Sequence, residues 1–180
     1  MRTKVGMVLL TVIIVVQVVF LAEKRRVRNL EPTRLAPGTS VKNIQLSVHD
    51  IQEPTADFER LWDAVSDRCT IMIFFDSDCT FCRQVAEEWR GVREVKYEGL
   101  TVPVKWTSVW ANDLGAAQFV EQYGLPSPWY SMRGREDRMA FGITEWPKLY
   151  LLAPEGVFEG ELARDVPPDG TAPPDRCRPS

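Results

Sequence analysis

Apolar residues gather in short runs that alternate with segments of helical spacing. The most compact run, at 71–75, is typical of a strand buried on both faces. Further apolar segments predict strands at 43–48, 102–109, 148–152 and 157–162, the last two forming a hairpin around Pro154-Glu155-Gly156. Helical spacing predicts helices over 55–65, 79–92 and 114–123. Alternating elements closed by a hairpin indicate an α/β domain.

Residues 5–22 are almost wholly apolar and are interrupted only by Gly6, Thr11 and Gln17. This run is at the short end of the length that spans a bilayer, and it could also be the apolar part of a secretory signal. A cleavable signal ends in a small-x-small pattern, and Phe20, two places before Ala22, fits that pattern poorly. The pattern therefore favours an uncleaved N-terminal transmembrane helix over residues 1–22.

The rest of the chain divides by composition. Residues 23–40 contain Pro32, Pro37 and Gly38 without apolar periodicity and read as a linker. The folded domain is predicted over 41–163. Residues 164–180 are rich in proline and predict a disordered tail.

The basic residues around the apolar run bear on membrane orientation. Before the run stand Arg2 and Lys4, and after it stand Lys24, Arg25, Arg26, Arg28 and Arg34. By the positive-inside rule alone, this excess would place the domain in the cytoplasm. Long domains are translocated largely regardless of loop charge, which leaves the opposite orientation open.

Charge and cysteine content exclude some classes of protein. The net charge of -3 is not the basic footprint of a nucleic-acid-binding protein, so no nucleic-acid partner is expected. Four cysteines are too few for a fold built on disulfides. Their spacing is more informative, because two of them form the Cys-x-x-Cys sequence Cys79-Thr80-Phe81-Cys82.

This Cys-x-x-Cys sequence stands where the buried strand at 71–75 gives way to a predicted helix. The first turn of a helix offers unpaired backbone N–H groups and the positive end of the helix dipole, which stabilise a thiolate at Cys79. Cys82 lies one turn further on, within reach of Cys79 but more buried. Such a pair can exchange electrons with another disulfide.

Two other roles are possible for Cys79 and Cys82. Half of a zinc site would need two more ligands. The only histidine, His49, lies far upstream, and Cys69 and Cys177 do not have the spacing of a second zinc-binding pair. Two incidental buried cysteines are the other alternative. A redox motif is favoured over both, and no cofactor or metal is expected.

A second feature precedes the strand at 148–152. Pro147 stands at the start of this strand, where proline loses no ladder hydrogen bond, and Trp146-Pro147 is a bond at which a cis peptide costs little. Cys-x-x-Cys at a helix start, followed by proline at the start of a later strand, resembles the thioredoxin superfamily. The resemblance covers roughly residues 55–162, and within the superfamily it is similar to membrane-anchored TlpA/ResA-like thiol–disulfide oxidoreductases.

The resemblance implies a fold, an activity and roles for particular residues. The fold is a thioredoxin-like three-layer sandwich with a mixed central sheet. Cys79 is then the nucleophile and Cys82 the resolving thiol, Pro147 is the cis-proline, and Trp146 offers its backbone to the substrate. Partners are protein dithiols or disulfides, and the domain is expected on the extracytoplasmic, periplasmic side of the membrane.

Several positions depart from the superfamily's usual residues. Asp78 replaces the usual tryptophan before the first cysteine, and Asp76 lies nearby, so two carboxylates would oppose a thiolate at Cys79 if they were close. Ile73 stands where a buried acid is usual, and Val85 where many TlpA-like helices carry glutamate. Glu87 and Glu88, further along the helix, are predicted to face solvent.

Alternatives for function and for the remaining residues stay open. A redox-inactive binding or assembly module with the same fold is one. A peroxiredoxin-like peroxidase is another, although Asp76 occupies the place where a threonine or serine would be needed. Cys69 is read as a buried thiol to which Cys177 could bond in an oxidising compartment. Four aromatic residues are assigned to core packing rather than to a substrate groove: Trp106, Trp110, Trp129 and Tyr130.

Overall fold

A computed structural model describes residue 17 and residues 34–49, 57–60, 68–97, 100–110, 114–162 and 175–177. The chain divides into two compact units, 1–32 and 33–180, and nearly all described residues belong to the second. The predicted anchor at 1–22 lies, except for residue 17, outside these ranges. Among the described residues, no helix is both long enough and apolar enough to cross a membrane.

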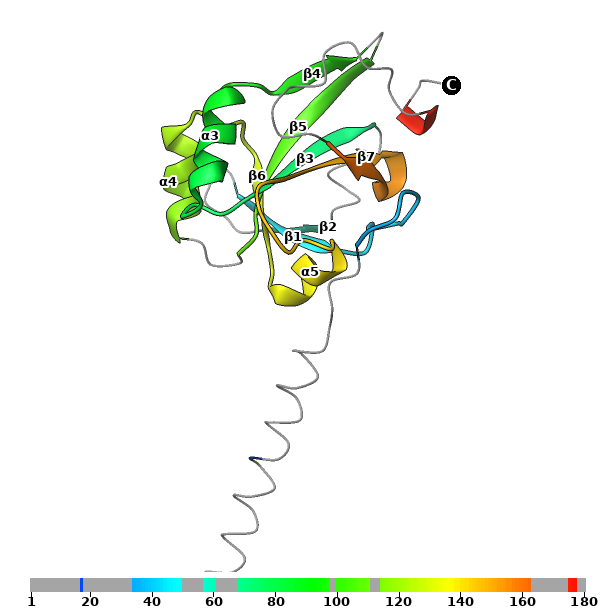
Figure 1. Ribbon diagram of the computed structural model, residues 1–180, viewed down its shortest axis with the longest axis horizontal. Helices are drawn as coiled ribbons and strands as arrows, with labels where there is room; N and C mark the ends of the chain where they lie inside the picture. The colour runs from blue at the N-terminus through cyan, green and yellow to red at the C-terminus, as the bar shows by residue number, and fades with distance from the viewer. Residues whose placement is uncertain are drawn as a thin grey trace, which may run out of the picture. The chain divides into compact units, whose positions relative to one another are not determined.

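The second unit is built on a mixed β-sheet (Figure 1). The strand order is β2-β1-β6-β5-β3-β7-β8, and β4 pairs with β5. The pairs β5–β3 and β5–β6 are parallel, and the other pairs are antiparallel. The strands are β1 (Gln45–His49), β2 (Asp57–Arg60), β3 (Thr70–Phe75), β4 (Glu94–Tyr97), β5 (Leu100–Ser108), β6 (Trp129–Met132), β7 (Lys148–Ala153) and β8 (Val157–Glu161).

Helices pack on both faces of this sheet. The helices α3 (Thr80–Glu88) and α4 (Leu114–Gln122) lie together on one side in Figure 1, and α5 (Arg135–Ala140) lies apart from them. Side chains of β3 alternate between two hydrophobic clusters, because successive strand residues point to opposite faces. Ile71, Ile73 and Phe75 pack with α3 and α4. Met72 and Phe74 join the cluster on the other face. The predicted three-layer α/β arrangement is therefore present, with β3 at its centre.

Most predicted elements are confirmed, with shifted ends. The strand at 71–75 is β3, and the strands at 43–48 and 102–109 are β1 and β5. The hairpin of β7 and β8 turns through Pro154–Gly156, a 3-10 turn in which Gly156 has a φ of +61°. The helix predicted over 79–92 ends at Glu88, with Trp89 as its C-cap, because the chain reverses at Gly91, which has a φ of +70°.

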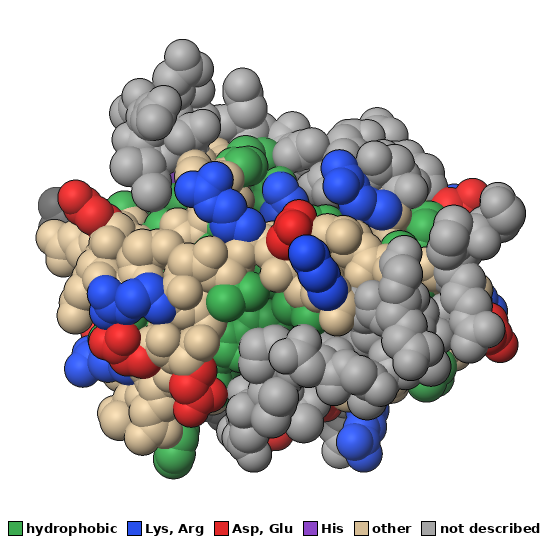
Figure 2. Space-filling model, turned by 90° about the horizontal axis from the view of Figure 1, so that it is seen from above, with side chains coloured by type: hydrophobic (Ala, Val, Ile, Leu, Met, Phe, Trp, Pro, Cys, Tyr) green, Lys and Arg blue, Asp and Glu red, His purple; other side chains and the backbone are tan. Residues whose placement is uncertain are grey.

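On the face seen in Figure 2, side chains of both charges lie among hydrophobic ones.

The helix predicted over 55–65 is wrong at 57–60, which form β2. Asp57–Arg60 pair with β1 in antiparallel register, so the backbone groups of the outer edge of β1 are satisfied by a strand. The helical spacing of four apolar residues did not outweigh this pairing. β4, β6 and α5 were not predicted, since each has only four to six residues.

The predicted linker and tail both contain ordered segments. In the segment assigned to the linker, the N–H of Gly38 donates to the carbonyl of Phe158 at 2.8 Å, and Ser40 forms a bridge with Val157. In the segment assigned to the disordered tail, Asp175–Cys177 form a 3-10 turn. Composition alone missed both, because backbone bonds to β8 and a covalent bond hold these segments in place.

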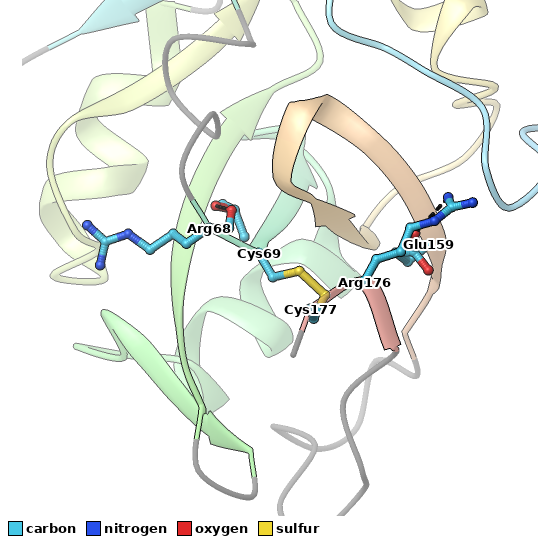
Figure 3. Close-up of a disulfide and its surroundings, with 6 residues drawn as sticks. Arg68, Cys69, Glu159, Arg176 and Cys177 are labelled. Carbon is cyan, nitrogen blue, oxygen red and sulfur yellow. Dashed lines mark hydrogen bonds and ion pairs between the residues drawn. A yellow bond between two sulfur atoms is a disulfide. The ribbon is translucent and has the colours of Figure 1, made fainter. Parts of the chain in front are cut away.

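That covalent bond is the disulfide between Cys69 and Cys177 (Figure 3). Cys69 lies at the start of β3 and is 2% exposed, and Cys177 is 5% exposed. Beside it, the Arg176 guanidinium pairs with the Glu159 carboxylate of β8 at 3.1 Å. The question of this bond, which the sequence left open, is thereby answered: Cys69 and Cys177 are bonded, and Cys79 and Cys82 are free.

Candidate active site

Cys79 is positioned by a tight turn between β3 and α3. After Phe75, the carboxylate of Asp76 accepts the backbone N–H of Asp78 at 2.9 Å, and the carbonyl of Asp76 accepts the N–H of Cys79 at 3.1 Å. Such side-chain-to-backbone bonds are typical of aspartate in turns. Cys79 is then the N-cap of α3, with extended backbone angles. The predicted place of Cys79, at the start of a helix that follows a buried strand, is confirmed.

The sulfur of Cys79 takes part in two polar contacts. It accepts the backbone N–H of Cys82, with a nitrogen–sulfur distance of 3.2 Å. Its thiol also points to the carbonyl oxygen of Trp146 at 3.7 Å. A hydrogen bond from a backbone N–H stabilises a charged sulfur more than a neutral one. The half-buried Cys79 thus lies between the first turn of α3 and the loop that leads to β7.

Cys82 has a different environment. Its side chain is 0% exposed and belongs to the cluster that α3 and α4 form with β3. Burial raises the pKa of the Cys82 thiol, and the hydrogen bond with Cys79 acts in the same direction, while a backbone hydrogen bond with Asp76 opposes them. Cys82 is therefore a protonated thiol that solvent does not reach, next to a cysteine that solvent does reach.

The loop before β7 faces Cys79 because of strand register. Phe74 of β3 pairs with Lys148, the first residue of β7, in an antiparallel ladder. Pro147 and Trp146 therefore lie beside the end of β3 from which the cysteine turn begins. Pro147 is buried, Trp146 is half-buried, and the peptide bond between them is cis, the geometry that the resemblance implies for this position. The structure thus brings together all four residues singled out from the sequence. A second cis peptide, Ser127–Pro128, was not expected.

Three further side chains at this edge of the sheet form an array that the sequence did not predict. Trp110 follows β5, whose Ser108 pairs with Phe75 in parallel register, so the chain segments after both strands meet. The indole N–H of Trp110 donates to the Asp76 carboxylate at 2.7 Å. On the indole ring lies the guanidinium of Arg138, with its central carbon 3.7 Å from the ring centre.

The array also contacts the loop before β7. The ring of Trp110 meets that of Trp146 edge to face, with ring centres 6.0 Å apart. Trp110 is 40% exposed, so its assignment to the core is wrong, whereas Trp106, Trp129 and Tyr130 are buried as predicted. Phe81, between the two cysteines, is 63% exposed. Only the position of Trp110 just after a predicted strand offered a sequence signal for its place here.

The positions that depart from the superfamily pattern are also placed. Ile73 and Val85 are buried in the hydrophobic core, so neither supplies an acid beside Cys82. Asp78 is exposed, and Glu87 and Glu88 face solvent as predicted, with Glu87 pairing with Arg90 at 2.9 Å. In addition to burial, the Asp76 carboxylate, which the Trp110 indole binds, acts electrostatically to raise the pKa of the Cys82 thiol.

In the ranges that the structure describes, potential metal ligands are not grouped around this site. Within the described part of the chain, no group of three or more histidine, cysteine or acidic side chains is arranged to hold a metal ion. His49 stacks on Trp129, with ring centres 4.1 Å apart, and its Nε2 lies 2.8 Å from the hydroxyl of Ser131. Burial lowers the pKa of His49. The histidine is thus engaged in the contact between β1 and β6.

The chain is similar to known proteins in its three-dimensional structure. No protein-family model and no curated protein matches the chain. Solved structures do match. The thioredoxin domain of a thiol-disulfide oxidoreductase from Bacteroides vulgatus has a TM-score of 0.51 at 15% identity, covering 75% of this chain and 91% of that one.

The fold is thioredoxin-like. Two further solved structures match a similar share of this chain. One, from Chlorobium tepidum and assigned as thiol:disulfide interchange protein DsbE, has a TM-score of 0.55 at 18% identity, covering 71% of this chain and 84% of that one. The other, an uncharacterized conserved protein from Geobacillus kaustophilus, has a TM-score of 0.58 at 17% identity, covering 80% and 78%. At these identities the likeness concerns the fold, so function has to be argued from the site.

Proposed function

We propose that this protein is a thiol–disulfide oxidoreductase that exchanges electrons with protein dithiols or disulfides through Cys79 and Cys82. The observation that carries the proposal is the pairing of a half-buried Cys79, whose sulfur accepts a backbone N–H, with a fully buried Cys82 one helical turn away. An accessible nucleophile and a protected resolving thiol are what two-step exchange needs. The names of the fold neighbours, thiol-disulfide oxidoreductase and interchange protein, agree with this chemistry.

The reaction proceeds in two displacements. The Cys79 thiolate attacks one sulfur of the partner disulfide, a bond forms between Cys79 and that sulfur, and the other partner sulfur leaves as a thiolate. The Cys82 thiol then gives its proton to the partner thiolate released in the first step and attacks the Cys79 sulfur, so that the second partner sulfur leaves as a thiolate. The partner is reduced by two electrons, and Cys79 and Cys82 are oxidised to a disulfide. Run in reverse, the same steps oxidise a partner dithiol.

Trp146 and Pro147 form the substrate-binding side of this proposal. The Trp146 carbonyl lies 3.7 Å from the Cys79 sulfur, so a partner segment that reaches Cys79 passes directly along this loop. The half-buried Trp146 lies beside Cys79, the exposed Trp110 packs against the Trp146 ring, and the exposed Phe81 lies between the two cysteines in the chain. These residues suit a partner chain in an extended form, with an apolar side chain beside its cysteine.

We also propose that the protein is membrane-anchored through residues 1–22 with its domain on the extracytoplasmic, periplasmic side. The buried disulfide between Cys69 and Cys177 supports this, since structural disulfides persist in oxidising compartments and are rare in the cytosol. The basic residues after the apolar run favour the opposite orientation. A topology reporter fused after Ser180 decides between the two.

The exchange is tested by single substitutions at the two cysteines. Cys79→Ser should abolish reduction of a model disulfide such as insulin, because no accessible nucleophile remains. Cys82→Ser should instead accumulate a mixed disulfide between Cys79 and the partner, visible on non-reducing gels and reversed by dithiothreitol. Thr80→Ser, at an exposed position of the same turn to which no role is assigned, is the matched control and should leave both reactions in place. If the wild-type protein neither reduces nor oxidises any model substrate, the fold serves a binding or assembly module instead.

A further inference from the structure

The array of Asp76, Trp110 and Arg138 resolves a conflict at the proposed site. An acidic side chain three residues before Cys79 should oppose a thiolate there. The structure, however, engages the Asp76 carboxylate twice: one oxygen accepts the Asp78 N–H at 2.9 Å, and the other accepts the Trp110 indole N–H at 2.7 Å. Both donors draw negative charge away from Cys79 and fix the carboxylate in the turn.

Arg138 completes this arrangement from the face of the indole ring. Its guanidinium carbon lies 3.7 Å from the centre of the Trp110 ring, at the distance of a strong cation–π contact. An indole that donates its N–H to a carboxylate has a more electron-rich ring, so the two contacts reinforce each other. Within the described part of the chain, the buried Nε of Arg138 has no hydrogen-bond acceptor. Its position is therefore set by the ring and by charge.

The charge on Arg138 is coupled to Asp76. Burial lowers the pKa of Arg138, and Arg135 acts in the same direction, whereas Asp76 raises it. Arginine nevertheless stays protonated in proteins. The Trp110 indole thus contacts both charges, the Asp76 carboxylate at its N–H edge and the Arg138 guanidinium over its face, so the negative charge of Asp76 is partly offset by a nearby cation.

Other charged residues belong to the elements that build this site, and each has its own setting. They come from the cysteine turn, from α3, from α5 and from the start of β7. The set comprises Asp78, which is exposed; Arg83, which donates to the Ser77 carbonyl at 3.5 Å; Arg135 of α5; and Glu145, which pairs with Lys148 at 3.0 Å. None of these bonds to Asp76 in the contacts above, whereas Arg138 interacts electrostatically with Asp76 and contacts the indole that binds its carboxylate.

We propose that Arg138 is a positioning residue for Cys79, which acts through Trp110 to hold and offset the Asp76 carboxylate so that the acidic turn does not oppose a thiolate. This rests on the proposed function of Cys79 as the attacking group. It predicts that loss of Arg138 alters the reactivity of Cys79, although Arg138 itself touches neither cysteine in any contact described above.

The test measures the rate of iodoacetamide alkylation of Cys79 against pH. All variants are made in the full chain carrying Cys82→Ser, where Cys79 is the single free thiol while Cys69 and Cys177 remain bonded. Arg138→Gln should raise the half-maximal pH of alkylation by roughly half a unit, which is about a threefold loss of rate below that midpoint. Arg138→Lys, which keeps a cation over the ring, should recover most of the shift. Trp110→Phe, which keeps the ring but loses the N–H donor, should shift the midpoint in the same direction as Arg138→Gln.

Two controls separate this role from a general charge effect. Arg135→Gln removes the same charge from the same helix without a ring beneath it, and should leave the midpoint unchanged. Asp76→Asn should lower the midpoint, and in that background Arg138→Gln should lose at least half of its effect. Equal shifts for Arg135→Gln and Arg138→Gln, or an undiminished Arg138→Gln shift in Asp76→Asn, would overturn the proposal.

Failure of this proposal can be told from failure of the proposed function. Alkylation needs no partner disulfide. If Arg138→Gln shifts the half-maximal pH of alkylation but the wild-type protein exchanges no electrons, only the oxidoreductase activity is refuted. A wild-type protein that exchanges electrons, combined with an unshifted Arg138→Gln midpoint, sinks only the role of Arg138.

Discussion

The disulfide between Cys69 and Cys177 allows a prediction of stability that can be worked out from chain length. It joins cysteines 108 residues apart, so it closes a loop that covers most of the sheet. For a loop of that length, the chain-entropy relation gives about 16 cal/mol/K, or about 5 kcal/mol at 25 °C. Measured effects usually fall below this bound, so we expect loss of the bond to lower the free energy of unfolding by about 3–5 kcal/mol.

The prediction is measured by thermal and urea unfolding of the full chain, followed by circular dichroism. In a Cys79→Ser, Cys82→Ser variant the only cysteines left are Cys69 and Cys177, and dithiothreitol should lower Tm by about 10–15 °C. The Cys69→Ala, Cys177→Ala variant should start at the lower Tm and should not respond to dithiothreitol. If dithiothreitol lowers the free energy of unfolding of the first variant by less than about 1 kcal/mol, the reasoning is refuted. The Cys69–Cys177 bond would then add little constraint to the unfolded chain.

Two further predictions concern the hairpin and the ion pairs of β7 and β8. Gly156 and Gly91 both have a positive φ, but an added Cβ at Gly156 would lie 3.2 Å from the Lys42 Cα, whereas at Gly91 it would meet nothing within 4 Å. Gly91→Ala should therefore cost about 1 kcal/mol in urea unfolding, and Gly156→Ala about 1–3 kcal/mol more; equal costs would contradict the close approach. Burial lowers the pKa of Lys148, but hydrogen bonds to Glu161 and Glu145 outweigh it, so the pKa is raised overall. A raised pKa contributes stability below the unfolded value of about 10.5, and this is lost as pH rises through the folded value. Glu161→Gln should thus destabilise the protein by about 1 kcal/mol near pH 8, more than Glu145→Gln. Both differences should shrink as the pH rises above about 10.5; differences that stay constant over that range would argue against the ion pair.

Residues with a strong local signal were placed correctly from sequence. The apolar run at 71–75 was predicted as a fully buried strand and the Cys-x-x-Cys after it as the start of a helix, and both predictions are confirmed. Pro147 was singled out by its place at a predicted strand start and by the resemblance, and it lies in the site because β7 pairs with β3. Local pattern and long-range pairing agreed at these positions.

The remaining parts of the site depended on contacts that no local pattern encodes. Trp110 and Arg138 lie 28 positions apart in the numbering, on a strand end and on a short helix that was not predicted. They meet only because β5 and β6 lie side by side and α5 follows β6. In the same way, residues 57–60 had helical spacing but are a strand because β1 offered an unpaired edge.

The redox chemistry of Cys79 and Cys82 is tested most directly by alkylation mass spectrometry across a series of dithiothreitol redox buffers. Three cysteines lie between Arg68 and Arg83, so cleavage before Asp76 and Asp78 is added to trypsin to separate Cys69 from the pair. The account predicts that Cys79 and Cys82 become protected together, in one two-electron transition of about 30 mV per tenfold change. The buried Cys69–Cys177 bond should stay intact at buffer potentials where the pair is reduced. If no Cys79–Cys82 bond forms in any buffer, the account of this site is contradicted.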